Sequence, residues 1–280
     1  MSAPGRISRL VGVEVLKVTG GRTIKIGLLA VAAVAAFTAW GHEPADHEET
    51  AWAVAKKSFG AGLWAAEIFL LVAGTTALAG ETAMGTLKMI LPHAYRRSDW
   101  VAAKAIVLVG EAILLLATAM ATALVAGMLS GGLSDVVQHF EADFSGAAAA
   151  DKVLHSSSEM YGHLFHSALV ALASLAATAL LGLFISCVFD AVIPALSAGF
   201  LLFLGFKSAG TLFGASPDLL KKIYASYPGE MLEKLGKLGR GLSERWDAEL
   251  FGRGLGLAAI VMGGCLLLGL IVFSRRDLQA

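Results

Sequence analysis

Three ionisable side chains lie inside long apolar stretches of the chain, namely Glu67, Glu111 and Lys207. A charged group is costly in membrane hydrocarbon, and one that occurs there usually lines a substrate path, binds an ion or belongs to a buried pair. The sequence leaves two interpretations open: a polar pathway, or a structural ion pair of Lys207 with one of the two carboxylates. A hydrogen bond at a helix interface is a further alternative for Glu111.

The residues around Lys207 also resemble the end of a phosphate-binding loop. Such a loop has the pattern G-x-x-x-x-G-K-[ST] and follows a strand, so that a glycine directly precedes the lysine. Here Phe206 separates Gly205 from Lys207, and the run lies in an apolar stretch. We therefore expect no ATP binding, no bound cofactor and no catalytic residue in this chain.

Histidines supply the only other candidate chemistry. Most of them lie in or beside the polar connections between apolar stretches: His42, His47, His139, His155, His163 and His166. His163 and His166 are three residues apart and could share a helical face, but no cysteine accompanies them. Solvated or interfacial histidines are the favoured interpretation, and no metal site is predicted.

The composition indicates which elements must position these groups. The 280 residues are 56% hydrophobic and only 16% charged, and the formal net charge is zero. So few charges cannot cover the surface of a soluble domain of this length, and we expect lipid to be the solvent for much of the chain. Zero net charge gives no attraction to nucleic acid, so no nucleic-acid partner is predicted.

Six apolar stretches are candidates for membrane-crossing helices. About 20 apolar residues cross a hydrocarbon core of ~30 Å, and lipid offers no hydrogen-bond partners to an irregular backbone. The expected spans are 26–41, 59–79, 100–129, 164–188, 191–213 and 252–273. We predict an all-α membrane protein with one transmembrane domain over residues 1–280.

The charges near the first span predict the topology. Six spans place both termini on one side of the membrane. Five basic residues precede the first span and four acidic residues follow it, which favours cytoplasmic termini. Residues 1–25 also carry an apolar stripe that predicts an interfacial helix along the inner leaflet: Ile7, Leu10, Val11, Val15 and Val18.

The outer connection 215–251 carries a second amphipathic pattern. Apolar residues recur there at steps of three and four, which predicts one helical face: Leu235, Leu238, Leu242, Trp246 and Leu250. The opposite face would hold Lys237, Arg240, Glu244 and Asp247. We expect an amphipathic helix on the membrane surface or over a pore mouth, and packing against the rest of the protein is an equal alternative.

A polar segment joins the second and third expected spans. From Glu81, Gly85 follows at four residues, Thr86 at five, Lys88 at seven and Lys104 at twenty-three. This spacing resembles that of the ABC-2 type permeases, whose corresponding segment reads E-x-x-x-G-T-L-[KR]-x-[LI]-L and is followed by an arginine and, seven residues later, a lysine. The family's proline before that arginine is replaced by Ala94, and Pro92 lies two residues earlier, so the bend is expected to be shifted.

Both ends of the chain resemble the same family. Residues 273–278, Phe-Ser-Arg-Arg-Asp-Leu, are similar to its closing signature F-x-R-R-D-[IL], and residues 14–16, Glu-Val-Leu, are similar to its entry helix. The resemblance implies the permease subunit of an ATP-driven transporter of the exporting kind in a bacterial plasma (inner) membrane. It also implies a second permease copy, as a homodimer or a paired permease.

The resemblance further implies a coupling helix on the cytoplasmic face. This helix would dock onto a separate ATP-binding subunit, which would bind ATP and Mg. The residues expected to couple the two subunits are Glu81, Gly85, Thr86, Leu87, Lys88, Leu91, Arg96 and Arg97. For Arg96 and Lys104, ordinary anchoring at the inner membrane face is the alternative.

Two other functions stay open from the sequence. One is an ATPase-driven scaffold that transmits force to an extracytoplasmic protein bound by the outer loops. The other is an ion-coupled secondary carrier that uses Glu67, Glu111 and Lys207.

Overall fold

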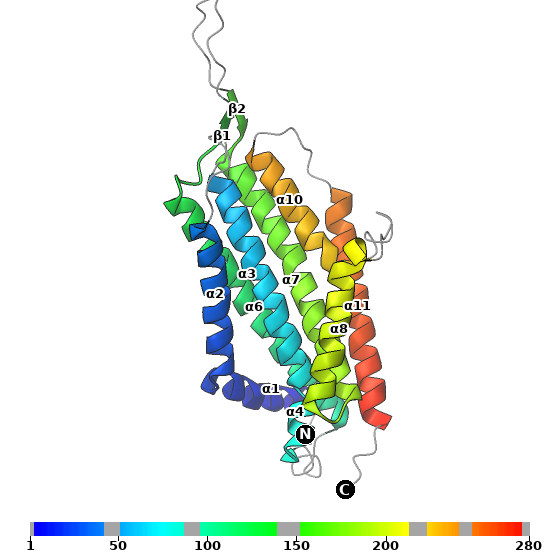
Figure 1. The fold of residues 1–280 in the computed structure, drawn as a ribbon. Helices are drawn as coiled ribbons and strands as arrows, with labels where there is room; N and C mark the ends of the chain where they lie inside the picture. Colours follow the sequence, from blue (N-terminus) through cyan, green and yellow to red (C-terminus); the bar gives the residue numbers. More distant parts are fainter. Residues whose placement is uncertain are drawn as a thin grey trace, which may run out of the picture.

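A computed structural model describes residues 3–41, 51–86, 96–138, 152–212, 223–240 and 248–275 of the chain. Its helices are α1 (Ala3–Gly20), α2 (Thr23–Trp40), α3 (Ala51–Thr76), α4 (Ala79–Ala83), α6 (Arg97–Leu129), α7 (Ser157–Val188), α8 (Val192–Leu212), the short 3₁₀ helix η1 (Tyr224–Ser226), α10 (Tyr227–Gly239) and α11 (Ala248–Arg275). The long helices run side by side in a bundle, and α1 lies across one end of it (Figure 1).

A small β-hairpin stands at the opposite end of the bundle. Strand β1 (Val136–Gln138) pairs antiparallel with β2 (Lys152–His155), with Val136 opposite His155. The hairpin extends beyond the helices, on the side away from α1 and from the end of α11 (Figure 1). Apart from this hairpin, the regular structure in the described part of the chain is helical.

Five helices among the described residues are long and apolar enough to cross a membrane: Thr23–Trp40, Ala51–Ala83, Arg97–Leu129, Ser157–Val188 and Ala248–Arg275. Helix α8 contributes a shorter apolar segment, Val192–Ser208. The prediction of an all-α, multi-pass membrane protein is confirmed at this level. The sixth span stays a prediction.

Two of these helices begin well before their apolar stretches. Helix α3 starts at Ala51 and not at residue 59, because Trp52 is buried and its Nε1 donates a hydrogen bond to the carbonyl oxygen of Ser134, 2.9 Å away. Helix α7 starts at Ser157 and not at residue 164, because the Ser156 hydroxyl accepts a hydrogen bond from the Glu159 amide and caps the helix.

The second crossing segment is interrupted where its apolar stretch was expected to end. Helix α3 stops at Thr76 and α4 begins at Ala79. The amides of Leu78 and Ala79 both donate to the buried hydroxyl of Ser186 on α7, at 2.8 Å each. The Ser186 hydroxyl therefore gives two amides at the break a partner that lipid could not supply.

Helix α7 lies at the centre of the bundle and contacts α3, α6, α8, α10 and α11. Its crossing with α3 is close because glycines face each other there. A Cβ atom on Gly74 would overlap the carbonyl oxygen of Ala179, and one on Gly182 would lie 3.0 Å from the carbonyl oxygen of Leu71. Small residues at such a crossing let helix backbones approach in a membrane.

The amphipathic helix expected around residues 235–250 is placed differently. Helix α10 spans Tyr227–Gly239 and ends there, so the prediction of one continuous helix is wrong. Its apolar face, Met231, Leu232, Leu235 and Leu238, is buried against α7 and α3. The alternative of packing on the protein itself is therefore correct for this segment. Leu242, Glu244, Trp246 and Asp247 lie outside the described residues, and Leu250 belongs to α11.

Candidate functional site: a buried charge network at the end of the bundle

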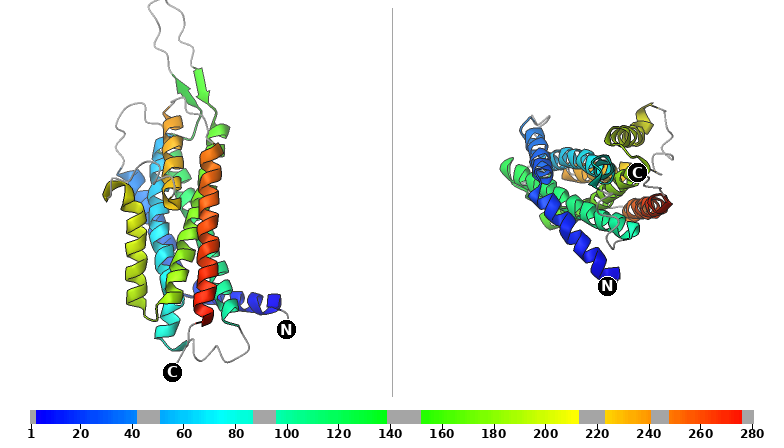
Figure 2. Two further views of the ribbon diagram at one scale, coloured as in Figure 1. Left: turned by 90° about the vertical axis from the view of Figure 1, so that its right-hand side faces the viewer. Right: turned by 90° about the horizontal axis from the view of Figure 1, so that it is seen from below.

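Helix α1 lies crosswise at the end of the bundle and projects beyond it (Figure 2). One of its faces rests on α6, and the residues of that face recur at steps of four and three: Arg6, Leu10, Glu14 and Lys17. Leu10 packs in a small buried cluster with Trp100 and Ala103 of α6. On one side of this contact the Arg6 Nε atom lies 3.4 Å from the Asp99 carboxylate. Helix α1 is thus docked by alternating charged and apolar contacts.

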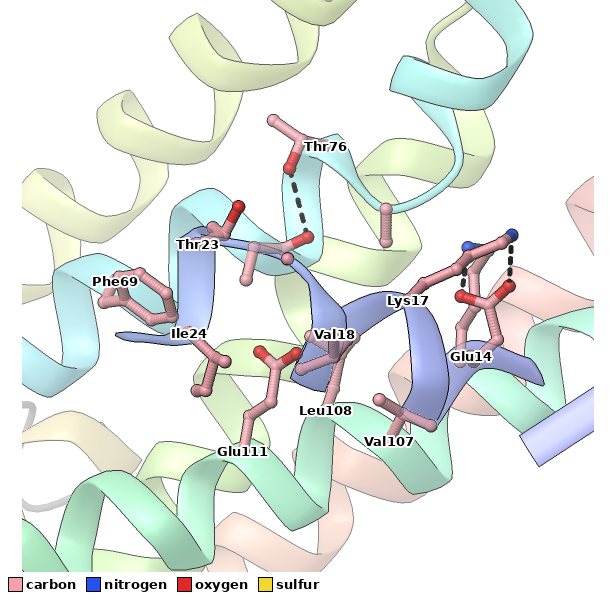
Figure 3. Close-up of a pocket in the computed structure, with 14 residues that line it drawn as sticks. Glu14, Lys17, Val18, Thr23, Ile24, Phe69, Thr76, Val107, Leu108 and Glu111 are labelled. Carbon is pink, nitrogen blue, oxygen red and sulfur yellow. Dashed lines mark hydrogen bonds and ion pairs between the residues drawn. The ribbon is translucent and has the colours of Figure 1, made fainter. Parts of the chain in front are cut away.

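Four charged side chains meet on the other side of Leu10. The Lys104 Nζ atom lies 3.0 Å from Glu14 Oε2 and 2.9 Å from Glu81 Oε1. The Lys17 Nζ atom lies 2.7 Å from Glu14 Oε1 and 3.1 Å from Glu81 Oε1. We call these four residues the charge network; part of it is seen in Figure 3. It joins three elements, α1, α4 and α6.

The network is largely buried. The side chains of Lys104, Glu14 and Glu81 are 6%, 7% and 14% exposed, whereas that of Lys17 is 46% exposed. Both ammonium groups also lie over the ring of Trp100, at 5.5 Å for Lys17 and 5.8 Å for Lys104. The ring face attracts cations, so Trp100 also stabilises the two ammonium groups.

The charge network favours the ionised forms of its two α1 residues, Glu14 and Lys17. Burial tends to raise the pKa of Glu14, but attraction to Lys104 and hydrogen bonds from both lysines outweigh it and lower that pKa. Burial tends to lower the pKa of Lys17, but the hydrogen bond to Glu14 and the charge of Glu81 outweigh it and raise that pKa. Glu14 and Lys17 therefore stay charged over a wider pH range than the free side chains.

The backbone after Glu81 explains the spacing Glu81, Gly85, Thr86. Helix α4 ends with Met84 as its C-cap, and Gly85 then has φ +71°, a conformation that side chains other than hydrogen disfavour. This reversal brings the Thr86 hydroxyl to the Glu81 carbonyl oxygen, 3.1 Å away. The turn thus closes on the backbone of Glu81 while the side chain of Glu81 contacts the two lysines.

The polar segment re-enters the bundle at Arg96 and Arg97. The backbone amide of Arg96 donates to the Asp99 carboxylate at 3.4 Å, at the first turn of α6. An Nη atom of Arg97 lies 3.5 Å from the carbonyl oxygen of Ser274, near the end of α11. The predicted coupling residues Leu87, Lys88 and Leu91 lie outside the described residues, as do residues 276–278 of the closing signature.

The structure brings the motif residues Glu81 and Lys104 into contact, although 23 positions separate them. Sequence reasoning missed Glu14 and Lys17 as their partners. The available signal was an acid three residues before a lysine in an otherwise apolar and basic amphipathic helix. It identifies a local pair but not the distant residues that complete it.

The ionisable groups within the spans separate into a pair and a single group. The Lys207 Nζ atom lies 2.7 Å from Glu67 Oε2, and the Glu67 side chain is only 4% exposed. Lys207 also donates to the carbonyl oxygen of Ala225 at 3.2 Å and lies over the ring of Phe203. Of the alternatives for Lys207, the pair with Glu67 is the one observed. Glu111 lies elsewhere, beside the charge network.

The expectation that the histidines bind no metal ion stays a prediction. Within the described ranges, no group of three or more His, Cys, Asp and Glu side chains is placed to hold a metal ion. His42, His47 and His139 lie outside those ranges.

Buried ion pairs join α1, α4 and α6 at this site. A family model described as "Protein of unknown function (DUF2705)" matches residues 26–279. A comparison with curated proteins finds no match.

Proposed function

The chain belongs to the DUF2705 family, and from the contacts of its own residues we propose that it is the membrane-spanning subunit of an ABC-2 type, ATP-driven transporter. The charge network carries this proposal. Glu14 comes from the segment that resembles the entry helix, and Glu81 and Lys104 come from the two ends of the segment that resembles the coupling motif. Segments that resemble one family at separate places in the chain are thus in direct contact.

The network suits a coupling role because of where it lies. The polar segment leaves the bundle at the Gly85 turn, four residues after Glu81, and returns at Arg96. A push on this segment by a partner reaches Glu81 first. Since Glu81 contacts lysines of both α1 and α6, the displacement is passed to the helix at the bundle end and to a membrane-crossing helix together.

In this proposal the segment after Gly85 is the coupling helix and docks onto a separate ATP-binding subunit that holds ATP and Mg. Helix α8 is the sixth span, and both termini are cytoplasmic in a bacterial inner membrane. Helix α1 then lies in the inner interface, where exposed apolar side chains such as Val13 and Leu16 contact lipid. A second permease copy completes the transporter, which acts in export.

One alternative has a specific observation in its favour. The β1–β2 hairpin extends beyond the helices at the end opposite the charge network (Figure 1). An ATPase-driven scaffold would use such a projection to bind an extracytoplasmic protein. If the chain is such a scaffold, a pull-down with the full-length chain as bait would recover an extracytoplasmic protein in stoichiometric amount. Substrate flux across the membrane would then be absent.

Purification of the tagged chain from its native host in mild detergent tests the main proposal. We expect an ATP-binding subunit to co-purify in stoichiometric amount with the wild-type chain. The variant Gly85→Pro/Arg97→Glu should lose it, because proline cannot adopt the positive φ of Gly85 and glutamate reverses the charge at the re-entry point.

The matched control is Arg253→Met, which removes an exposed cation from the Glu249–Arg253 pair on α11. It should retain the partner. A wild-type chain that purifies without any ATP-binding protein contradicts the proposal, and an ion-coupled carrier then becomes the leading alternative. A variant that keeps its ATPase contradicts the assignment of the coupling segment.

A further inference from the structure

A cavity of about 200 Å³ lies beside the charge network. It is open on one side and is bordered by the elbow between α1 and α2, by α3 and by α6 (Figure 3). Most of its lining is apolar: Val18, Ile24, Phe69, Ala77, Val107 and Leu108. Water occupies about 30 Å³ per molecule in the liquid, so the cavity has room for a small organic group as well as for water.

One carboxylate points into this cavity from α6. Figure 3 shows the Glu111 side chain directed towards the α1–α2 elbow, between Val18 and Ile24. Glu111 is only 8% exposed, and its Oε2 atom is buried with no hydrogen-bond partner among the described residues. An unpaired carboxylate in such surroundings is costly, and a buried polar group normally has a partner.

The nearby cations do not supply that partner. The Lys17 and Lys104 ammonium groups each contact both Glu14 and Glu81. Lys104 precedes Glu111 by seven residues on the same helix, which is about 10 Å along its axis. Around the cavity the described charges are two lysines and, with Glu81 and Glu14 included, three carboxylates. Lys104 exerts an electrostatic attraction on Glu111, but Glu111 is the one of these carboxylates that forms no ion pair among the described residues.

We propose that this cavity binds a primary ammonium group with a short apolar body, and that Glu111 is its counter-ion. An ammonium supplies the missing charge and donates the hydrogen bond that Oε2 lacks. The apolar walls contact the carbon chain, which a bare metal ion would not use. Two sources share this chemistry: a free organic amine, or the head group of an aminophospholipid at the membrane interface. The inference goes beyond the proposed function and does not depend on an ATP-binding partner.

Binding of hexylamine to the purified full-length chain tests the proposal. Calorimetry and thermal unfolding would be run with hexylamine and with the matched six-carbon probes hexanol and hexanoate. We expect hexylamine to bind and raise Tm, because only it carries the cation. Glu111→Gln should weaken hexylamine binding by about tenfold or more, as loss of one charged hydrogen bond does.

Two further variants separate the contribution of the Glu111 charge from that of the cavity volume. Ala77→Leu fills part of the cavity and keeps Glu111, so it should also weaken hexylamine binding. Glu249→Gln removes an exposed carboxylate at the far end of α11 and should change nothing. Because Glu111→Gln removes an unpaired buried charge, it should fold at least as stably as the wild type without ligand.

The lipid source is tested in nanodiscs that contain phosphatidylethanolamine or, as the control, phosphatidylcholine alone. A phosphatidylethanolamine-dependent rise in Tm that Glu111→Gln abolishes supports the proposal with lipid as the source. Hexylamine binding that requires Glu111 supports it with a free amine. If hexylamine and hexanol bind equally, or Glu111→Gln alters neither hexylamine nor lipid effects, the proposal is overturned.

Discussion

Removing the cation at the centre of the charge network should destabilise the fold strongly. In the variant Lys104→Met, the buried carboxylates of Glu14 and Glu81 lose their shared buried partner. Breaking a buried pair by removing one member costs about 3–5 kcal/mol, because the remaining charge stays desolvated. Lys17 still contacts both carboxylates, so we expect the lower end, about 3 kcal/mol of unfolding free energy.

The assay is reversible unfolding in mixed micelles, with Arg253→Met as the matched control. Both variants replace a long cation by methionine, but the Glu249–Arg253 pair is exposed on both sides and should contribute at most about 1 kcal/mol. In the double variant Glu14→Gln/Lys104→Met, the loss should be smaller than the sum of the single losses. If Lys104→Met costs no more than Arg253→Met, the network does not hold these helices together.

Three other comparisons of variants test separate parts of the structure. Gly74→Ala should lower Tm because its Cβ overlaps the α7 backbone, whereas Gly110→Ala on α6 meets nothing within 4 Å and should be neutral or stabilising. Lys207→Met should cost about 3 kcal/mol by leaving Glu67 buried and unpaired, and adding Glu67→Gln should recover most of it. The lowered pKa of Glu14 means that its contribution is present above its ordinary value of 4.5 and is lost as pH falls through the folded pKa. A Tm–pH profile should therefore fall more steeply at acidic pH in the wild type than in Glu14→Gln; equal slopes would contradict this.

Hydropathy located the crossing helices because the requirement for apolar length is local and strong. The hydropathy pattern placed the start of α3 too late, because Lys56 and Lys57 make the sequence there polar. The helix continues there because Trp52 is buried, with its ring edge against Tyr161 of α7 at 5.0 Å between centroids. That contact joins residues more than a hundred positions apart, and no local pattern reveals it.

The site was predictable in its residue types but not in its partners. The spacing from Glu81 singled out Gly85, Thr86 and Lys104, and the positive φ of Gly85 gives one of these positions a conformational reason. The partners Glu14 and Lys17 could not be assigned, because α1 lies crosswise and meets α6 through tertiary contacts alone. The prediction of one helical face over residues 235–250 was wrong because the apolar periodicity continues in the sequence past Gly239, whereas the helix ends there.

The central claim is that this chain couples ATP hydrolysis by a partner to its own membrane helices. It is tested most directly by the ATP hydrolysis rate of the purified complex in nanodiscs, compared between the wild type, Glu81→Gln and Glu249→Gln. We predict hydrolysis that falls by about fivefold or more in Glu81→Gln, as loss of a coupling contact does, and that is unchanged in Glu249→Gln. Equal rates in all three, or no hydrolysis in the wild-type complex, would contradict the claim.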